Sequence, residues 1–154
     1  AARSVDVGCV RLTERHLRSD PPPPDEVQAA EADVRAALEL VAAEVPVEET
    51  ATLVGLAGSV TTVAALALAL PAYDPVAIHG SRIPVGAVRS VSAGLLTATR
   101  ARRAAYPVMH PGRVDVIGAG ALVLRVVMDA FDLDEVVVSE HDILDGIALR
   151  LARP

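Results

Sequence analysis

Residues 52–70, TLVGLAGSVTTVAALALAL, contain the best candidate for a ligand-binding loop. An apolar run is followed by small and hydroxyl-bearing residues and then by an Ala/Leu segment; those residues are Gly55, Gly58, Ser59, Thr61 and Thr62. Glycine lets a backbone approach a ligand closely, and the free N–H groups at the start of a helix favour an anion. The pattern therefore predicts a strand, a tight turn and a helix, with phosphate as the candidate ligand.

A structural interpretation of the same loop stays open beside the functional one. The spacing matches neither the P-loop nor the dinucleotide-binding pattern. Small residues also let a buried strand and its helix pack closely, and Ser59 can serve as a helix cap. Both interpretations can hold together.

Arg113 is the second candidate for an anion contact. It stands at the start of a long apolar helix, expected over residues 113–131, where a cation meets the positive end of the helix dipole. We therefore expect a compensating group, either Asp115 or a bound anion.

Three titratable residues, Glu140, His141 and Asp142, follow the apolar run EVVVS at residues 135–139. The run predicts a buried strand, and the end of such a strand in an open α/β sheet is where ligands bind. The alternative is that Asp142 caps the next helix while Glu140 and His141 face water.

Other polar residues give weaker signals. His79 and Arg82 lie in a connecting loop at residues 72–84, where they either face a ligand or lie on the surface. Arginines at residues 100–103 either contact a polyanion or belong to an exposed turn. The four histidines do not have the spacing of metal ligands, and Cys9 lies in an apolar run typical of a buried, inert thiol.

The composition limits the function classes. A chain of 154 residues suits one domain with a real core, but aromatic residues make up only 2%, so the core must consist of Ala, Val, Leu and Ile and lean on a neighbouring surface. The net charge of −6 argues against nucleic acid or an anionic membrane as partner. A single cysteine, no visible signal peptide and apolar runs too short to span a bilayer indicate a cytoplasmic protein. Because the sequence lacks an initiator Met, we expect a fragment without its upstream half.

Hydrophobic periodicity predicts strands interspersed with helices. We expect strands near residues 4–10, 51–56 and 135–139, and helices near residues 25–44, 59–70, 85–98, 100–105, 113–131 and 142–152.

Six blocks of sequence carry a resemblance to a known family. In chain order they are SVDVGCVRLTERHL, PPPPDE, VGLAGSVTTVAAL, YDP with IHGSRI, HPGRVDVIGAGALVLRVVM and SEHDILDGIAL. Together they resemble the carboxyl-terminal lobe of the exopolyphosphatase/guanosine pentaphosphate phosphohydrolase (Ppx/GppA) family. The resemblance implies an α/β fold that is half of an actin-like, ribonuclease-H-like fold, with a mixed sheet and flanking helices, truncated at the amino end. The active site then lies between two lobes.

By this resemblance the parent protein is a hydrolase that releases orthophosphate from the end of inorganic polyphosphate, or that removes the 5′-phosphate of pppGpp. A glutamate acts on water and a divalent cation such as Mg²⁺ helps to neutralise the phosphates. The family's catalytic glutamate and phosphate loops lie upstream of this sequence, so we expect no catalytic residue, no metal bound by this chain and no activity of the chain alone.

The resemblance assigns phosphate or substrate binding to the residues of the first loop and to Arg113; these are Gly55, Gly58, Ser59, Thr61, Thr62 and Arg113. It assigns a cleft-lining place to Arg11, Glu140, His141 and Asp142. The parent fold has two further strands between residues 4–10 and 51–56, and their absence leaves an exposed edge. We therefore expect a homodimer or a retained amino-terminal lobe as partner. The alternative function is a noncatalytic module that binds a guanosine alarmone such as ppGpp.

Overall fold

A small mixed sheet lies on one side of the molecule. The computed structural model describes residues 1–49 and 52–152, and within them the sheet has three strands in the order β1-β3-β2. Strand β1 (Leu53–Leu56) runs parallel to β3 (Glu135–Ser139), and β2 (Arg82–Pro84) runs antiparallel to β3. The sequence therefore placed two of the strands, with residue 51 of the first outside the described part.

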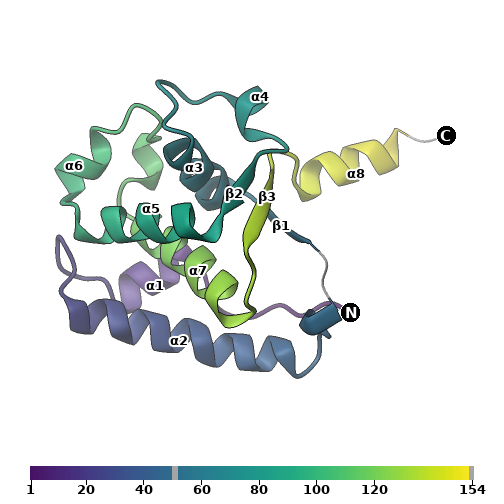
Figure 1. Cartoon of the computed structure of the whole chain (residues 1–154), viewed down its shortest axis with the longest axis horizontal. Helices are drawn as coiled ribbons and strands as arrows, with labels where there is room; N and C mark the ends of the chain where they lie inside the picture. Colours follow the sequence, from purple (N-terminus) through teal and green to yellow (C-terminus); the bar gives the residue numbers. More distant parts are fainter. Residues whose placement is uncertain (50–51, 153–154) are drawn as a thin grey trace.

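Helices, joined by loops, make up most of the rest of the described chain (Figure 1). The α-helices are α1 (Cys9–Arg15), α2 (Pro24–Ala42), α3 (Gly58–Ala67), α4 (Pro75–Ile78), α5 (Val85–Thr97), α6 (Arg100–Ala104), α7 (Ile117–Ala130) and α8 (Ile143–Leu151). Two short 3₁₀ turns, η1 (Val47–Glu49) and η2 (Pro111–Arg113), precede β1 and α7.

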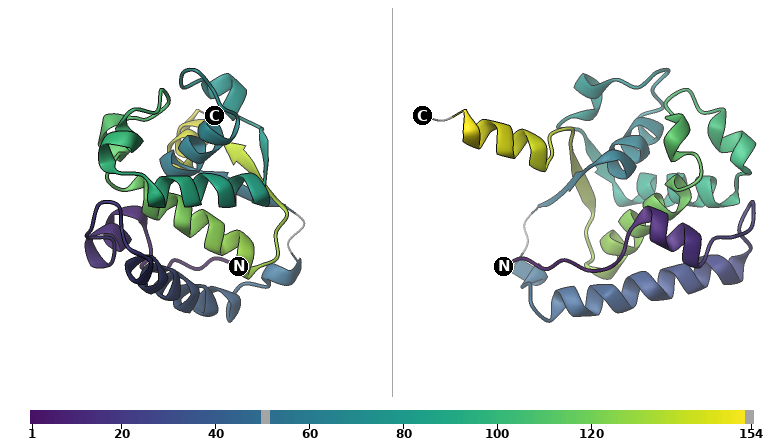
Figure 2. Two further views of the ribbon diagram at one scale, coloured as in Figure 1. Left: turned by 60° about the vertical axis from the view of Figure 1, so that its left-hand side comes forward. Right: turned by 180° about the vertical axis from the view of Figure 1, so that it is seen from behind.

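Helix α7 is the centre of the fold, lying between α5 and α2 (Figure 2). It also packs against α1 and α3, so nearly every side of it is covered. Ile117, Leu122 and Val126 are fully buried there, as expected of a helix that is apolar all round. The core is built mainly from Ala, Val, Leu and Ile, as the composition indicated, and also contains Met109 and Met128.

One face of the sheet packs on the helices and the other is open. Val136 and Val138 of β3 point into the core formed with α3 and α5. On β1, which is an edge strand, Val54 and Leu56 are 54% and 48% exposed. The sheet therefore presents apolar side chains to solvent.

Helix α8 projects away from the body of the molecule (Figure 1). It has no buried residue, and Ile143 and Leu151 are 75% and 81% exposed. Its start is nevertheless well defined, because Asp142 and Asp145 form a capping box. Local capping rather than packing fixes this helix.

The structure corrects three predictions. Residues 4–10 are not a strand: the segment is extended without a strand partner up to Gly8, and α1 begins at Cys9, so that Leu12 can be buried against α2 and α7. The expected connecting loop at residues 72–84 contains α4 and β2. Helix α7 begins at Ile117 instead of residue 113, because Arg113 belongs to η2.

The remaining helices lie where the sequence placed them, within about three residues at each end. No helix among residues 1–49 and 52–152 is long and apolar enough to cross a membrane.

Candidate anion-binding site

The start of α3 carries the guanidinium group of Arg113. A Cβ atom built on Gly58, the first residue of α3, would lie 2.5 Å from Cζ and 2.6 Å from Nε of Arg113. Only glycine leaves room for the guanidinium in this position. The chain enters α3 through Ala57, whose φ of 70° lies in a region that glycine usually occupies.

Thr62 fixes the guanidinium against the helix. Nη1 of Arg113 donates to Oγ1 of Thr62 at 2.9 Å, and this hydroxyl donates to the carbonyl oxygen of Gly58 at 2.7 Å. Thr62 is fully buried. The arrangement brings a cation to the positive end of a helix, which is unfavourable unless an anion offsets both charges.

Tyr73 links this cluster to the end of β3. Its hydroxyl lies 2.8 Å from Oγ1 of Thr61 and 2.7 Å from Oε1 of Glu140. Burial and the carboxylate of Glu140 raise the pKa of Tyr73, while hydrogen bonding with Thr61 and Arg113 lowers it less. The phenol therefore stays protonated and able to donate.

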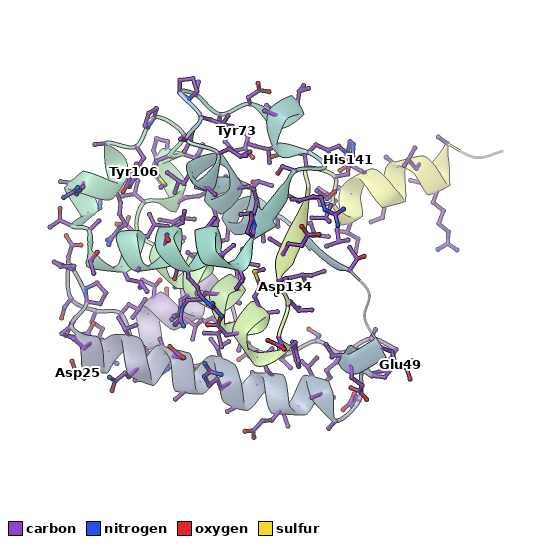
Figure 3. All side chains as sticks on the ribbon, in the orientation of Figure 1. Asp25, Glu49, Tyr73, Tyr106, Asp134 and His141 are labelled. Carbon is purple, nitrogen blue, oxygen red and sulfur yellow. The ribbon has the colours of Figure 1, made fainter. Side chains whose placement is uncertain are left out.

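Two histidines stand next to Glu140. The backbone N–H of Glu140 donates to Nδ1 of His79 at 3.2 Å, and the rings of His79 and His141 meet edge to face with 4.7 Å between centroids. Nδ1 of His141 also lies 3.6 Å from Oδ1 of Asp145. Figure 3 shows Tyr73 and His141 at the opposite end of β3 from Asp134, at the carboxyl end of the strand.

A cavity of about 380 Å³ adjoins the guanidinium. It is lined by Tyr73, Pro107, Val108, Met109, His110, Pro111 and Arg113. Its walls are mainly apolar, with one guanidinium and one imidazole. A ligand whose anionic group contacts Arg113 could therefore place a further group in this cavity.

Two of the predicted site residues, Gly55 and Ser59, have structural roles. A Cβ on Gly55 would lie 2.7 Å from Val60 and 2.9 Å from Val136, so this glycine allows β1 and α3 to pack closely. Ser59 lies against Gly120 of α7, where a Cβ would come within 2.7 Å of the serine Cβ. Ser59 is not a helix cap, since Ala57 is the N-cap residue.

Some of the other predicted residues lie together in the structure, and others do not. Gly58, Thr61, Thr62, Arg113 and Glu140 come together, and His141 joins them through His79. Asp142 caps α8, accepting from the backbone N–H of Leu144 at 2.8 Å. Arg11, on α1, pairs with Asp6 and is not joined to this cluster by a hydrogen bond within the described residues.

Tyr73 is the site residue that sequence reasoning missed. It lies in a loop beside Pro71, 67 residues from Glu140 and 12 from Thr61, so no local pattern could reveal the contact. The only signal was its rarity, because the chain has two tyrosines.

A resident metal has no preformed site in the described part of the chain. No three or more His, Cys, Asp or Glu residues among 1–49 and 52–152 are grouped so as to hold a metal ion. Hydroxyl groups, a guanidinium and helix amides are donors, which suit an anion.

The fold and the site define an α/β protein with a candidate anion-binding loop between a parallel strand and its helix. Residues 1–153 match the model of the Ppx/GppA phosphatase family. The chain belongs to this family.

The relatives are about twice as long. The chain is 52% identical over 156 aligned residues to exopolyphosphatase 2 of Mycobacterium tuberculosis strains H37Rv and CDC 1551, spanning 99% of this chain and 49% of that protein. An exopolyphosphatase-like protein of known structure superimposes with a TM-score of 0.95 at 37% identity, covering 98% of this chain and 50% of that one.

A Ppx/GppA phosphatase from Aquifex aeolicus superimposes with a TM-score of 0.86 at 26% identity, covering 96% of this chain and 48% of that protein. The predicted fold class, half of an actin-like α/β fold with a small mixed sheet and flanking helices, is therefore confirmed.

Proposed function

We propose that the chain is the carboxyl-terminal lobe of a two-lobe exopolyphosphatase and binds the phosphate chain of inorganic polyphosphate. The observation that carries the proposal is the guanidinium of Arg113 packed on Gly58 at the start of α3. Family membership and the 52% identity to a protein named exopolyphosphatase 2 support the choice of substrate.

The site suits condensed phosphate because it concentrates hydrogen-bond donors of two kinds. The first amides of α3 have no acceptor within the helix and point outward from its start. The guanidinium of Arg113 adds a fixed positive charge. A phosphate chain carries an oxygen anion on each unit, so it can contact both groups at once and offset the unfavourable helix-start position of Arg113.

Catalysis in this proposal requires the other lobe. The resemblance places the catalytic glutamate upstream of this sequence, and the carboxylate of Glu140, which lies in the cluster with Arg113, is held by a hydrogen bond from Tyr73. In the two-lobe protein a divalent cation such as Mg²⁺ neutralises phosphate charge. This chain's own residues bind and orient the substrate, and the chain alone is expected to be inactive.

Two exposed apolar regions support a retained amino-terminal lobe as partner. The open face of the sheet carries Val54 and Leu56, and α8 carries Ile143 and Leu151. The alternative is that a second copy of the chain covers these two regions. The proposed protein acts in the cytoplasm, with neither nucleic acid nor membrane as partner, consistent with its net charge of −6.

A second substrate, pppGpp, is favoured by the cavity of about 380 Å³ next to Arg113. Its apolar wall of prolines and Met109, with Tyr73 and His110, offers surfaces on which a nucleoside can stack while its phosphates reach the guanidinium. The same cavity serves the noncatalytic alternative, a module that binds a guanosine alarmone without turnover.

The test compares both substrates on a two-lobe protein, made by joining the chain to the half of the M. tuberculosis relative that it does not span. We expect phosphate release from polyphosphate, and a rise in KM of about tenfold or more for Arg113→Ala. Arg102→Ala is the matched control, because Arg102 is an exposed arginine of α6. Faster release from pppGpp would select the second substrate, binding of ppGpp without any release would select the noncatalytic module, and unchanged kinetics for Arg113→Ala would reject the site.

A further inference from the structure

Glu140 places a negative charge at the edge of a site built from donors. Its carboxylate accepts from the hydroxyl of Tyr73 at 2.7 Å. That hydroxyl also lies 2.8 Å from Thr61, on the helix whose first residue carries the guanidinium of Arg113. The carboxylate is joined to these groups through Tyr73, beside the position that the proposed function assigns to a phosphate.

Counting protons gives the direction of the hydrogen bonds. Tyr73 has one hydroxyl proton and two oxygen neighbours. A bond to an ionised oxygen is the stronger one, so Tyr73 donates to Glu140 and accepts from the hydroxyl of Thr61. The chain Thr61–Tyr73–Glu140 thus ends on an anion, and an arriving phosphate oxygen offers the same acceptor.

The backbone and the side chain of Glu140 are held differently. Its N–H donates to His79, which fixes the backbone directly after β3. Its carboxylate reaches the site through the hydroxyl of Tyr73, a half-exposed contact that water or another anion can replace. The carboxylate can therefore leave without unfolding the strand end.

We propose that Glu140 is an internal stand-in for a substrate phosphate, and that condensed phosphate displaces its carboxylate and takes over the hydrogen bond from Tyr73. Tyr73 is then a substrate-binding residue, and Glu140 sets the affinity of the site by competing with the substrate. This inference rests on the anion site of the proposed function and adds to it a residue that binds and a residue that opposes binding.

The test measures binding of sodium tripolyphosphate to the 154-residue chain by isothermal titration calorimetry at low ionic strength. Glu140→Gln is expected to tighten binding by about fivefold, because it removes one like charge near the phosphate. Tyr73→Phe is expected to weaken binding by about three- to tenfold, since one charge-assisted hydrogen bond is lost.

Two controls separate this effect from general changes in charge or packing. Glu39→Gln removes a carboxylate that is exposed on α2, and Tyr106→Phe removes the other tyrosine hydroxyl; neither should change the affinity. In the Tyr73→Phe background, Glu140→Gln should give a smaller gain than fivefold, because no hydrogen bond remains to be released. A purely structural role of Glu140 would instead produce weaker binding.

Weaker or unchanged binding by Glu140→Gln overturns the inference, as does unchanged binding by Tyr73→Phe when both variants keep the circular dichroism spectrum of the parent chain. Absence of tripolyphosphate binding to the unaltered chain also overturns it. The proposed function fails by a different result, the absence of phosphate release by the two-lobe protein, so the two failures are distinguishable.

Discussion

Replacing Gly58 by alanine should remove the guanidinium of Arg113 from the start of α3 while leaving the fold intact. The new Cβ would lie 2.5 Å from Cζ of Arg113, a separation that real atoms do not tolerate. The atoms that must move belong to the far end of a flexible side chain, not to the backbone. We therefore expect Arg113 to swing away and to lose its hydrogen bond to Thr62.

The effect on stability should be small because two terms oppose each other. Alanine stabilises a helical position by about 1 kcal/mol relative to glycine. Loss of the bond between Arg113 and Thr62 costs about 1 kcal/mol. The free energy of unfolding of Gly58→Ala should therefore change by less than about 1 kcal/mol in urea denaturation.

The effect on anion affinity should be large. A hydrogen bond to a charged group contributes about 1.5–3 kcal/mol, which corresponds to a Kd for tripolyphosphate weaker by about tenfold to a hundredfold. Gly58→Ala combined with Arg113→Ala should bind no more weakly than Arg113→Ala alone, because both changes remove the same group. Calorimetric titration of the three variants measures this directly.

Gly86→Ala supplies the matched control. Gly86 lies on α5, and a Cβ there meets no atom within 4 Å. We expect this variant to gain up to about 1 kcal/mol of stability with unchanged anion affinity. Unchanged affinity of Gly58→Ala would refute the anion site at Arg113, and destabilisation by more than about 3 kcal/mol would show that the side chain cannot move aside.

Three further predictions concern the elements that position the site. Gly120→Ala should destabilise the fold by about 1–3 kcal/mol in urea, because its Cβ would lie 2.7 Å from that of Ser59, and Ser59→Gly should restore part of the loss. Burial raises the pKa of Glu31, but hydrogen bonds from Arg125 and Arg35 outweigh this effect and hold the pKa below its usual 4.5. Its stabilising contribution is therefore present above pH 4.5 and lost as the pH falls below it, so Glu31→Gln should destabilise at pH 7 and have little effect at pH 3. Asp142→Ala should destabilise α8 by about 1 kcal/mol, seen as faster hydrogen exchange of its amides, because the capping box is lost.

Strong local patterns predicted most of the helices and two of the three strands in the described residues. Helix α2 shows a clear apolar face, and the three valines of β3 are a continuous buried run. Strand β2 was missed because it has three residues, ends at Pro84 and forms only through its pairing with β3. The alternation at residues 4–10 suggested a strand, but residues 4–8 have no strand partner in the described part of the chain, and α1 begins at Cys9 with Leu12 buried against α2 and α7.

The candidate site was only partly predictable, for a physical reason. Arg113 was suspected because a cation at a helix start is unfavourable, and that argument needs no tertiary structure. Its contact is with the start of α3, however, and not with the start of α7 that follows it. Tyr73 could not be found in the sequence, since its partners depend on how α3 and β3 come together.

Some residues of the loop at the start of α3 serve packing, and others serve the proposed anion binding. Gly55 allows β1 to approach α3, and Ser59 fits against Gly120, so these two small residues set where α3 lies relative to α7. Arg113 ends η2, shortly before α7 begins at Ile117, and its guanidinium reaches Gly58 only because the two helices are this close. A larger residue at position 120 should therefore weaken anion binding as well as stability, although it touches no ligand. The functional and structural interpretations of this loop are consequently two parts of one arrangement.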